Sequence, residues 1–129
     1  MELTRLTEAQ VQARRIYNAL GEVESLSRQV AEALDRNDPM AVKVLLAMRE
    51  EPILAAHHAR DILRQMVEST DDGGRLRALL NGAAAENADE RGLANQIAMN
   101  ERLLAQIREL DRVLSQKIAR DKSFYETAK

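Results

Sequence analysis

Mostly apolar residues recur at alternating steps of three and four along the first part of the chain. The series consists of Leu6, Ala9, Ala13, Ile16, Leu20, Val23, Ser27, Val30 and Leu34. This spacing is typical of a helix that packs along a near-parallel neighbour. It predicts a helix from about Leu6 to Arg36, about 45 Å long at 1.5 Å per residue. Thr7 and Gln10 stand at capping-box spacing at its expected start.

Polar, turn-forming residues interrupt the helical pattern twice. The first break is Asp35–Pro39, in which Asp38 is placed to cap a helix that begins with Pro39. The second break is Ser69–Gly74, and a short helix is expected after it, at Arg75–Leu80. Breaks this short require the long helices on either side of each to run antiparallel.

The segment between the two breaks carries a second series with the same spacing. Its members are Leu45, Met48, Pro52, Ala55, Ala59, Ile62 and Met66. A proline inside a helix removes one backbone hydrogen bond and costs about 3 kcal/mol. Because the series keeps its phase across Pro52, we expect a kinked helix, with a short break at Glu50–Glu51 as the alternative.

A third series predicts a last long helix, from about Ala88 to Lys122. It consists of Leu93, Ile97, Asn100, Leu104, Ile107, Asp111, Leu114 and Ile118. Asn87 is the expected N-cap of this helix. Asn100 is the better candidate for a polar residue that fixes the register between helices, whereas Asp111 is expected to point outward.

These patterns predict an all-α protein, because no strand-like alternation appears anywhere in the chain. We expect a single domain over residues 1–129: an antiparallel helical bundle of three long helices plus one short helix, with coiled-coil-like packing. Hydrophobic residues make up 45% of the chain but aromatic residues only 2%, so the core must be aliphatic. The chain has no cysteine, which excludes disulfides and thiolate chemistry.

Charge and hydropathy narrow the function classes. Charged residues make up 31% of the chain and nearly balance, with a net charge of −2. The chain therefore lacks the basic excess that binds nucleic acid or an anionic membrane. Its apolar runs are shorter than a membrane span. The start, Met1–Arg5, lacks the basic and apolar regions of a signal peptide, so a cytoplasmic location is expected.

Few residues suggest catalysis. His57 and His58 point about 100° apart on a helix, whereas a zinc site needs at least three convergent ligands. The phrase Ala47–Leu54 resembles the Arg-Glu stretch of the helical chorismate mutases. None of the three apolar series, however, carries the basic residue that would pair with a buried dicarboxylate. We therefore expect no enzymatic activity, no metal and no cofactor.

A second apolar stripe lies beside the main series of the last helix. The candidate partner-binding residues are Met99, Leu103, Leu110 and Val113 of this stripe, with Phe124 and Tyr125 of the chain end. The two stripes together form an apolar arc wider than a two-helix contact needs. Either the last helix packs between both other helices, or part of the arc is an exposed groove for a partner helix. The two aromatic residues either fold back onto the bundle or form a binding hot spot.

The order and lengths of the expected helices, with two phrases, resemble the flagellar export chaperones of the FlgN and FliT type. The first phrase is Ala33–Asp38 leading into Val44–Glu50, and the second is Ile97–Ile107, with an Asn followed closely by Leu-Leu. The chain departs from this family in lacking a second Asn near Asn100 and in the proline at position 52.

The resemblance implies a cytoplasmic chaperone that binds the terminal helices of flagellar hook-associated or filament-cap subunits. Such a protein keeps its subunit unpolymerised and passes it to the export apparatus. The alternative is a generic helical coiled-coil adaptor or a homodimeric scaffold without enzymatic activity, because the same helical series serve either role equally well.

Overall fold

The computed structural model describes the backbone of residues 2–69 and 73–128 and the side chains of residues 2–69 and 73–120. Its helices, in chain order, are α1 (Leu3–Asp35), α2 (Pro39–Met48), α3 (Glu50–Glu68), α4 (Gly73–Leu80) and α5 (Ala88–Ala128). The described residues contain no strand, so the all-α class predicted from the sequence is confirmed for them.

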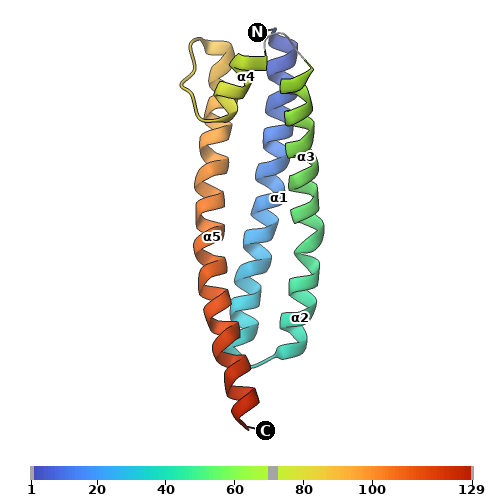
Figure 1. Cartoon of the computed structure of the whole chain (residues 1–129), viewed down its shortest axis with the longest axis vertical. Helices are drawn as coiled ribbons and strands as arrows, with labels where there is room; N and C mark the ends of the chain where they lie inside the picture. The colour runs from blue at the N-terminus through green and yellow to red at the C-terminus, as the bar shows by residue number, and fades with distance from the viewer. Residues whose placement is uncertain (1, 70–72, 129) are drawn as a thin grey trace.

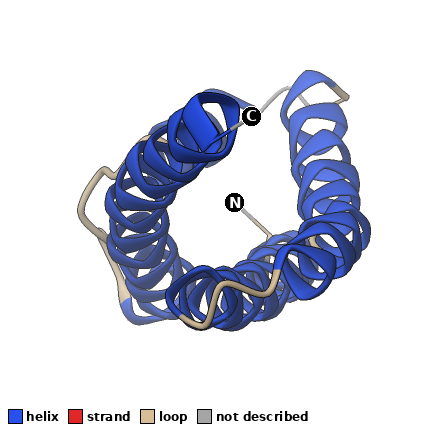
Figure 2. Ribbon diagram, turned by 90° about the horizontal axis from the view of Figure 1, so that it is seen from below, coloured by secondary structure: helices blue, strands red, loops and turns tan. Residues whose placement is uncertain are grey.

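The long helices form a curved layer with α1 at its centre (Figure 1). Helix α5 runs parallel to α1 along one side, and α2 and α3 run antiparallel to α1 along the other. Within the described part of the chain, no Cα atom of α3 lies within 8 Å of one in α5. The view along the helices therefore shows an open arc rather than a closed ring (Figure 2).

Helix α1 can occupy the centre because apolar residues lie on several of its sides. Ala9, Ala13, Val30 and Ala33 have no exposed surface. The helix begins at Leu3, three residues earlier than predicted. The expected capping box is wrong, because the Thr7 hydroxyl donates to the Leu3 carbonyl at 2.9 Å instead of capping the helix.

The turn between α1 and α2 follows from local side-chain chemistry. Asn37 has φ +55°, a conformation that asparagine tolerates at a helix C-terminus. The Asp38 side chain accepts a hydrogen bond from the Ala41 amide at 3.1 Å, and Pro39 opens α2. This N-cap and its proline are where the sequence predicted them.

The second long segment divides into two helices at a single residue. Arg49 separates α2 from α3 but keeps helical dihedral angles, φ −66° and ψ −24°. Its amide donates to the Leu45 carbonyl and its carbonyl accepts from the Ile53 amide, both at 3.2 Å. The described part of the chain therefore has five helices, and the interruption lies at Arg49 rather than at Glu50–Glu51.

Helix α4 closes one end of the layer. Its Leu76 and Leu79 have no exposed surface and pack with Leu93 of α5. Arg75 holds α4 to α5: its Nε lies 3.0 Å from Glu90 Oε2 and its Nη2 lies 2.5 Å from Glu90 Oε1. These bonds, with one donated by the backbone of Glu86, lower the pKa of Glu90 to about 2.

The start of α5 agrees with the sequence. The Asn87 side chain accepts a hydrogen bond from the Glu90 amide at 3.0 Å, as an N-cap residue does. The Arg75 guanidinium also donates to the Ala84 carbonyl at 2.9 Å. The loop between α4 and α5 is thus tied to both helices, which fixes the position of α4 across the end of the layer.

A candidate partner-binding groove

The concave side of the layer contains a groove over α1, with α3 and α5 as its walls. The cavity has a volume of about 580 Å³. Apolar lining residues from the three long helices include Ile16, Leu20, Ile53, Leu63, Leu104 and Ile107. Leu63 and Ile107 are buried, whereas Ile16, Leu20 and Leu104 are only half-buried. Water therefore reaches apolar surface that a further helix could cover.

The two walls of the groove carry different charges. Arg60 and Arg64 project from α3, with Glu68 at the end of the same wall. Glu101 and Asp111 line the α5 wall. The α3 wall is therefore mainly basic and the α5 wall is acidic, so an occupant would meet opposite charges along its two edges.

An ion pair crosses the groove at the end away from α4. Arg49 Nη2 lies 3.1 Å from both carboxylate oxygens of Asp111 and donates to Oδ2. The Arg49 side chain is only 14% exposed. Within the described part of the chain, Arg49 Nε and Asp111 Oδ1 are buried without a hydrogen-bond partner. Such atoms are rare in native proteins, and a polar group from an occupant would satisfy them.

This ion pair corrects two expectations from the sequence. Asp111 was expected to point outward, but it lines the groove because Arg49 reaches it from the opposite wall. Basic residues were not expected in the helical core. Arg49 and Arg60 nevertheless belong to a series, shifted by about one position from the one used for prediction, that lines the groove: Arg49, Ile53, Ala56, Arg60, Leu63 and Val67. The alternating steps of four and three in this series were the sequence signal from which its place in the groove could have been predicted.

Asn100 holds the α5 wall against α1. Its side chain is 7% exposed, donates to the Ala13 carbonyl at 2.9 Å and accepts from Gln96 at 3.1 Å. A buried amide that bonds to the backbone of the neighbouring helix favours one axial position of α5 over others. The expected role of Asn100 in fixing the register between helices requires such a contact.

The predicted partner-binding residues of α5 lie together, but not in the groove. Met99 is 37% exposed, Leu103, Leu110 and Val113 are half-buried, and none of the four lines the cavity.

Gly92 shows which side of α5 these residues occupy. A Cβ atom at Gly92 would approach the Gln10 side chain of α1 to 2.8 Å. Met99 and Leu103 follow Gly92 by seven and eleven residues, which places them on the same helix face. The stripe therefore borders the contact with α1 on the flank away from the groove. Phe124 and Tyr125 lie outside the residues whose side chains are described.

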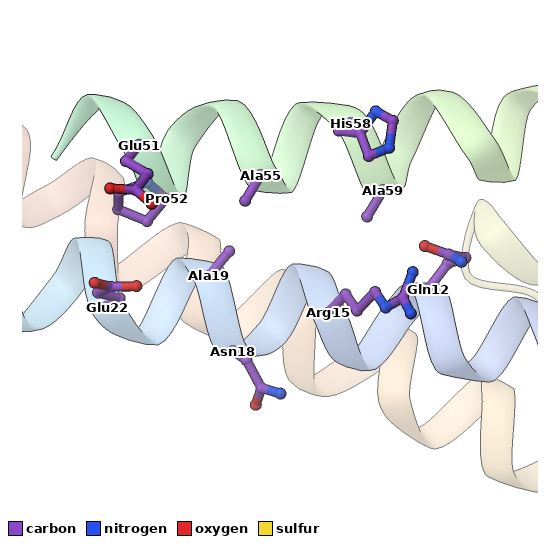
Figure 3. A pocket seen from close by; sticks show the side chains of 10 residues that line it. All are labelled: Gln12, Arg15, Asn18, Ala19, Glu22, Glu51, Pro52, Ala55, His58 and Ala59. Atoms are coloured by element: carbon purple, nitrogen blue, oxygen red, sulfur yellow. The ribbon is translucent and has the colours of Figure 1, made fainter.

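The two histidines lie on different sides of the layer. His57 lines the groove, and His58 lines a separate pocket of about 370 Å³ between α1 and α3 (Figure 3). In that pocket, Glu22 and Glu51 lie at one end and Arg15 at the other. No group of three or more potential metal-ligating His, Cys, Asp or Glu residues occurs among the described residues.

A scan against protein-family models, a search of curated proteins and a search of solved structures found no match to this chain. Among the helices that the structure describes, none is long and apolar enough to cross a membrane.

Proposed function

We propose that this protein binds an amphipathic helix of a partner protein in the groove between α3 and α5. The observation that carries the proposal is the open three-helix layer. In a closed four-helix bundle a fourth helix packs against two neighbours and buries their inner faces. Here α3 and α5 both pack on α1 and leave that fourth position vacant. The partner helix would complete a four-helix bundle with α1, α3 and α5.

The groove has a length that suits a helix of about four turns. On the α5 wall its lining residues extend from Ile97 to Asp111, which is about 21 Å at 1.5 Å per residue. Helix α4 limits it at one end and the Arg49–Asp111 ion pair at the other. An occupant would therefore contribute about three or four apolar anchors at helical spacing.

The energetics favour a partner with several large aliphatic anchors. Burying one Leu or Ile side chain is worth roughly 1.5–3 kcal/mol, and the occupant would also cover the half-buried Leu20 and Leu104. The burial free energy of three or four such anchors is of the same order as the roughly 4–15 kcal/mol that association costs. Acidic residues beside Arg60 and Arg64, and a basic residue beside Glu101, would add orientation more than affinity.

The partner that we favour is a terminal helix of a flagellar hook-associated or filament-cap subunit. The resemblance of the sequence to FlgN- and FliT-type chaperones supports this choice. A segment that polymerises through an apolar helical face would be shielded while that face lies in the groove. In this proposal the protein acts in the cytoplasm, without catalysis or cofactor, and releases its subunit at the export apparatus.

Neighbouring leucines of α5 provide a matched test. Leu104 lines the groove, whereas Leu103 lies on the other flank, and both are half-buried. Each is replaced by Ala, and calorimetric titration measures binding of a peptide carrying a subunit's terminal helix. Removing one anchor that becomes buried should weaken binding about tenfold or more for L104A, and L103A should bind nearly as wild type does. Thermal unfolding of both variants controls for stability.

The alternatives give different results in the same experiment. If L103A weakens binding and L104A does not, the partner uses the stripe predicted from the sequence and the groove is not the site. If the wild-type protein binds no subunit helix, the chaperone proposal is wrong. Equal binding of an unrelated amphipathic helix with the same charge pattern would indicate a general adaptor instead.

A further inference from the structure

Helix α2 exposes an apolar face that nothing in the described part of the chain covers. Lys43 is its only charged residue, and none of its residues is buried. Met40, Val44 and Met48 are 69%, 51% and 52% exposed, and their spacing of four residues places them on one helix face. A contiguous exposed apolar patch on a protein surface commonly marks an interaction site.

The patch continues into the first turns of α3. Ala47 of α2 is exposed and lies on the same face. Leu54 of α3, which is 66% exposed, extends this face. We call Met40, Val44, Ala47, Met48 and Leu54 the α2–α3 stripe. It makes this segment, rather than the groove, the site where most of the large exposed apolar side chains of the described chain gather.

The stripe points away from the groove. On the same segment the groove is lined by Arg49, Ile53 and Ala56, which lie about half a turn around the helix from the stripe. Helix α3 forms one edge of the open layer (Figure 2). A partner on the stripe would therefore leave the groove accessible.

The charges beside the stripe are arranged symmetrically about Ala47. Lys43 lies four residues before it and Glu51 four residues after it, and both are exposed. Neither is in an ion pair or side-chain hydrogen bond with any described residue. In an antiparallel pair of such segments, Lys43 of each copy would stand at the level of Glu51 of the other. The occupant that matches this pattern is a second copy of the same chain.

We propose that the protein forms a homodimer through the α2–α3 stripe, with a two-fold axis at Ala47. The two-fold operation repeats each contact twice, as an isologous interface requires. It places Met40 of one copy at the level of Leu54 of the other. Alanine at the crossing point permits the helices to approach closely. The dimer does not depend on helix binding in the groove, and it would present two grooves facing away from the interface.

Charge reversal tests this pairing directly. Sedimentation equilibrium of the full chain should give a mass that approaches twice the 14.5 kDa of one chain as concentration rises. K43E and E51K each bring like charges together twice and should weaken dimerisation about tenfold or more. The double variant K43E/E51K exchanges the two charges and should restore the dimer. R102E makes the same charge change as K43E at an exposed site on α5 and should leave the mass unchanged.

Two results would overturn the proposal: a wild-type protein that remains a monomer at every concentration, or a K43E variant that dimerises as the wild type does. If the dimer is kept in K43E but lost in L104D, the second copy lies in the groove instead. Circular dichroism of each variant checks that the fold is kept when the dimer is lost. The fold should be kept because all of these substitutions lie at exposed or half-buried positions.

Discussion

The ion pair across the groove predicts how much stability is lost when either of its two partners is replaced. Arg49 is 14% exposed and Asp111 is 41% exposed, so the two partners differ in what they lose when the other is removed. Replacing Asp111 by Ala leaves a largely buried guanidinium with Nη2 and Nε both unpaired. Replacing Arg49 by Met leaves a carboxylate that water can reach, and it retains most of the apolar stem.

The magnitudes follow from this asymmetry. Exposed pairs contribute about 0–1 kcal/mol, whereas removing one partner of a buried pair costs about 3–5 kcal/mol. This pair has one largely buried and one partly exposed member, so we expect D111A to cost about 1–2 kcal/mol and R49M less than about 1 kcal/mol. The double variant R49M/D111A also removes the buried unpaired atoms Arg49 Nε and Asp111 Oδ1. It should therefore be more stable than D111A alone.

Urea unfolding of the four proteins, followed by circular dichroism, completes a double-mutant cycle. At high salt the coupling energy between Arg49 and Asp111 should fall only in part, because salt screens a partly buried pair weakly. Two results would contradict this order of effects: R49M destabilises more than D111A, or the two single effects add in the double variant. Either result would mean that the ion pair does not span the groove in solution.

Two further predictions concern the end of the layer that α4 closes. Because the pKa of Glu90 is lowered to about 2 from 4.5, its carboxylate stabilises the fold fully above its unfolded-state pKa and loses that effect as pH falls toward 2. Melting temperatures of E90Q should thus fall below wild type at neutral pH and converge with it in acid; parallel curves would contradict this. Leu93 has no exposed surface, so L93A should lower the free energy of unfolding by about 2–5 kcal/mol. L20A should lower it by less, because Leu20 is half-buried. Equal losses of stability in chemical unfolding would mean that Leu20 is covered and the groove floor is closed.

Much of the helical layout could be predicted because its determinants are local. Asp38 and Asn87 cap helices in the structure with the hydrogen bonds that their side chains form with nearby amides. Thr7 shows the limit of the same reasoning. Its hydroxyl can cap a helix or bond to a carbonyl four residues earlier, and the spacing to Gln10 is the same in both cases.

The location of the groove could not be predicted from one helix at a time. Periodicity shows that α5 has a wide apolar arc, but not which flank a neighbouring helix covers. That choice depends on the rotation of α5 against α1, which follows from contacts such as Asn100 with the Ala13 carbonyl and Gly92 beside Gln10. The Arg49–Asp111 pair joins residues 62 positions apart, and no local pattern links them.

The groove is bounded at both ends, and only its middle is open. At one end α4 buries Leu76 and Leu79, and at the other Arg49 spans the groove to Asp111. A chain with only 2% aromatic residues has few side chains large enough to fill the space between α3 and α5 by itself. A partner helix of about four turns fits between these two ends, whereas a longer one would have to displace α4 or break the ion pair. The closures at the two ends therefore set the length of helix that the groove can hold.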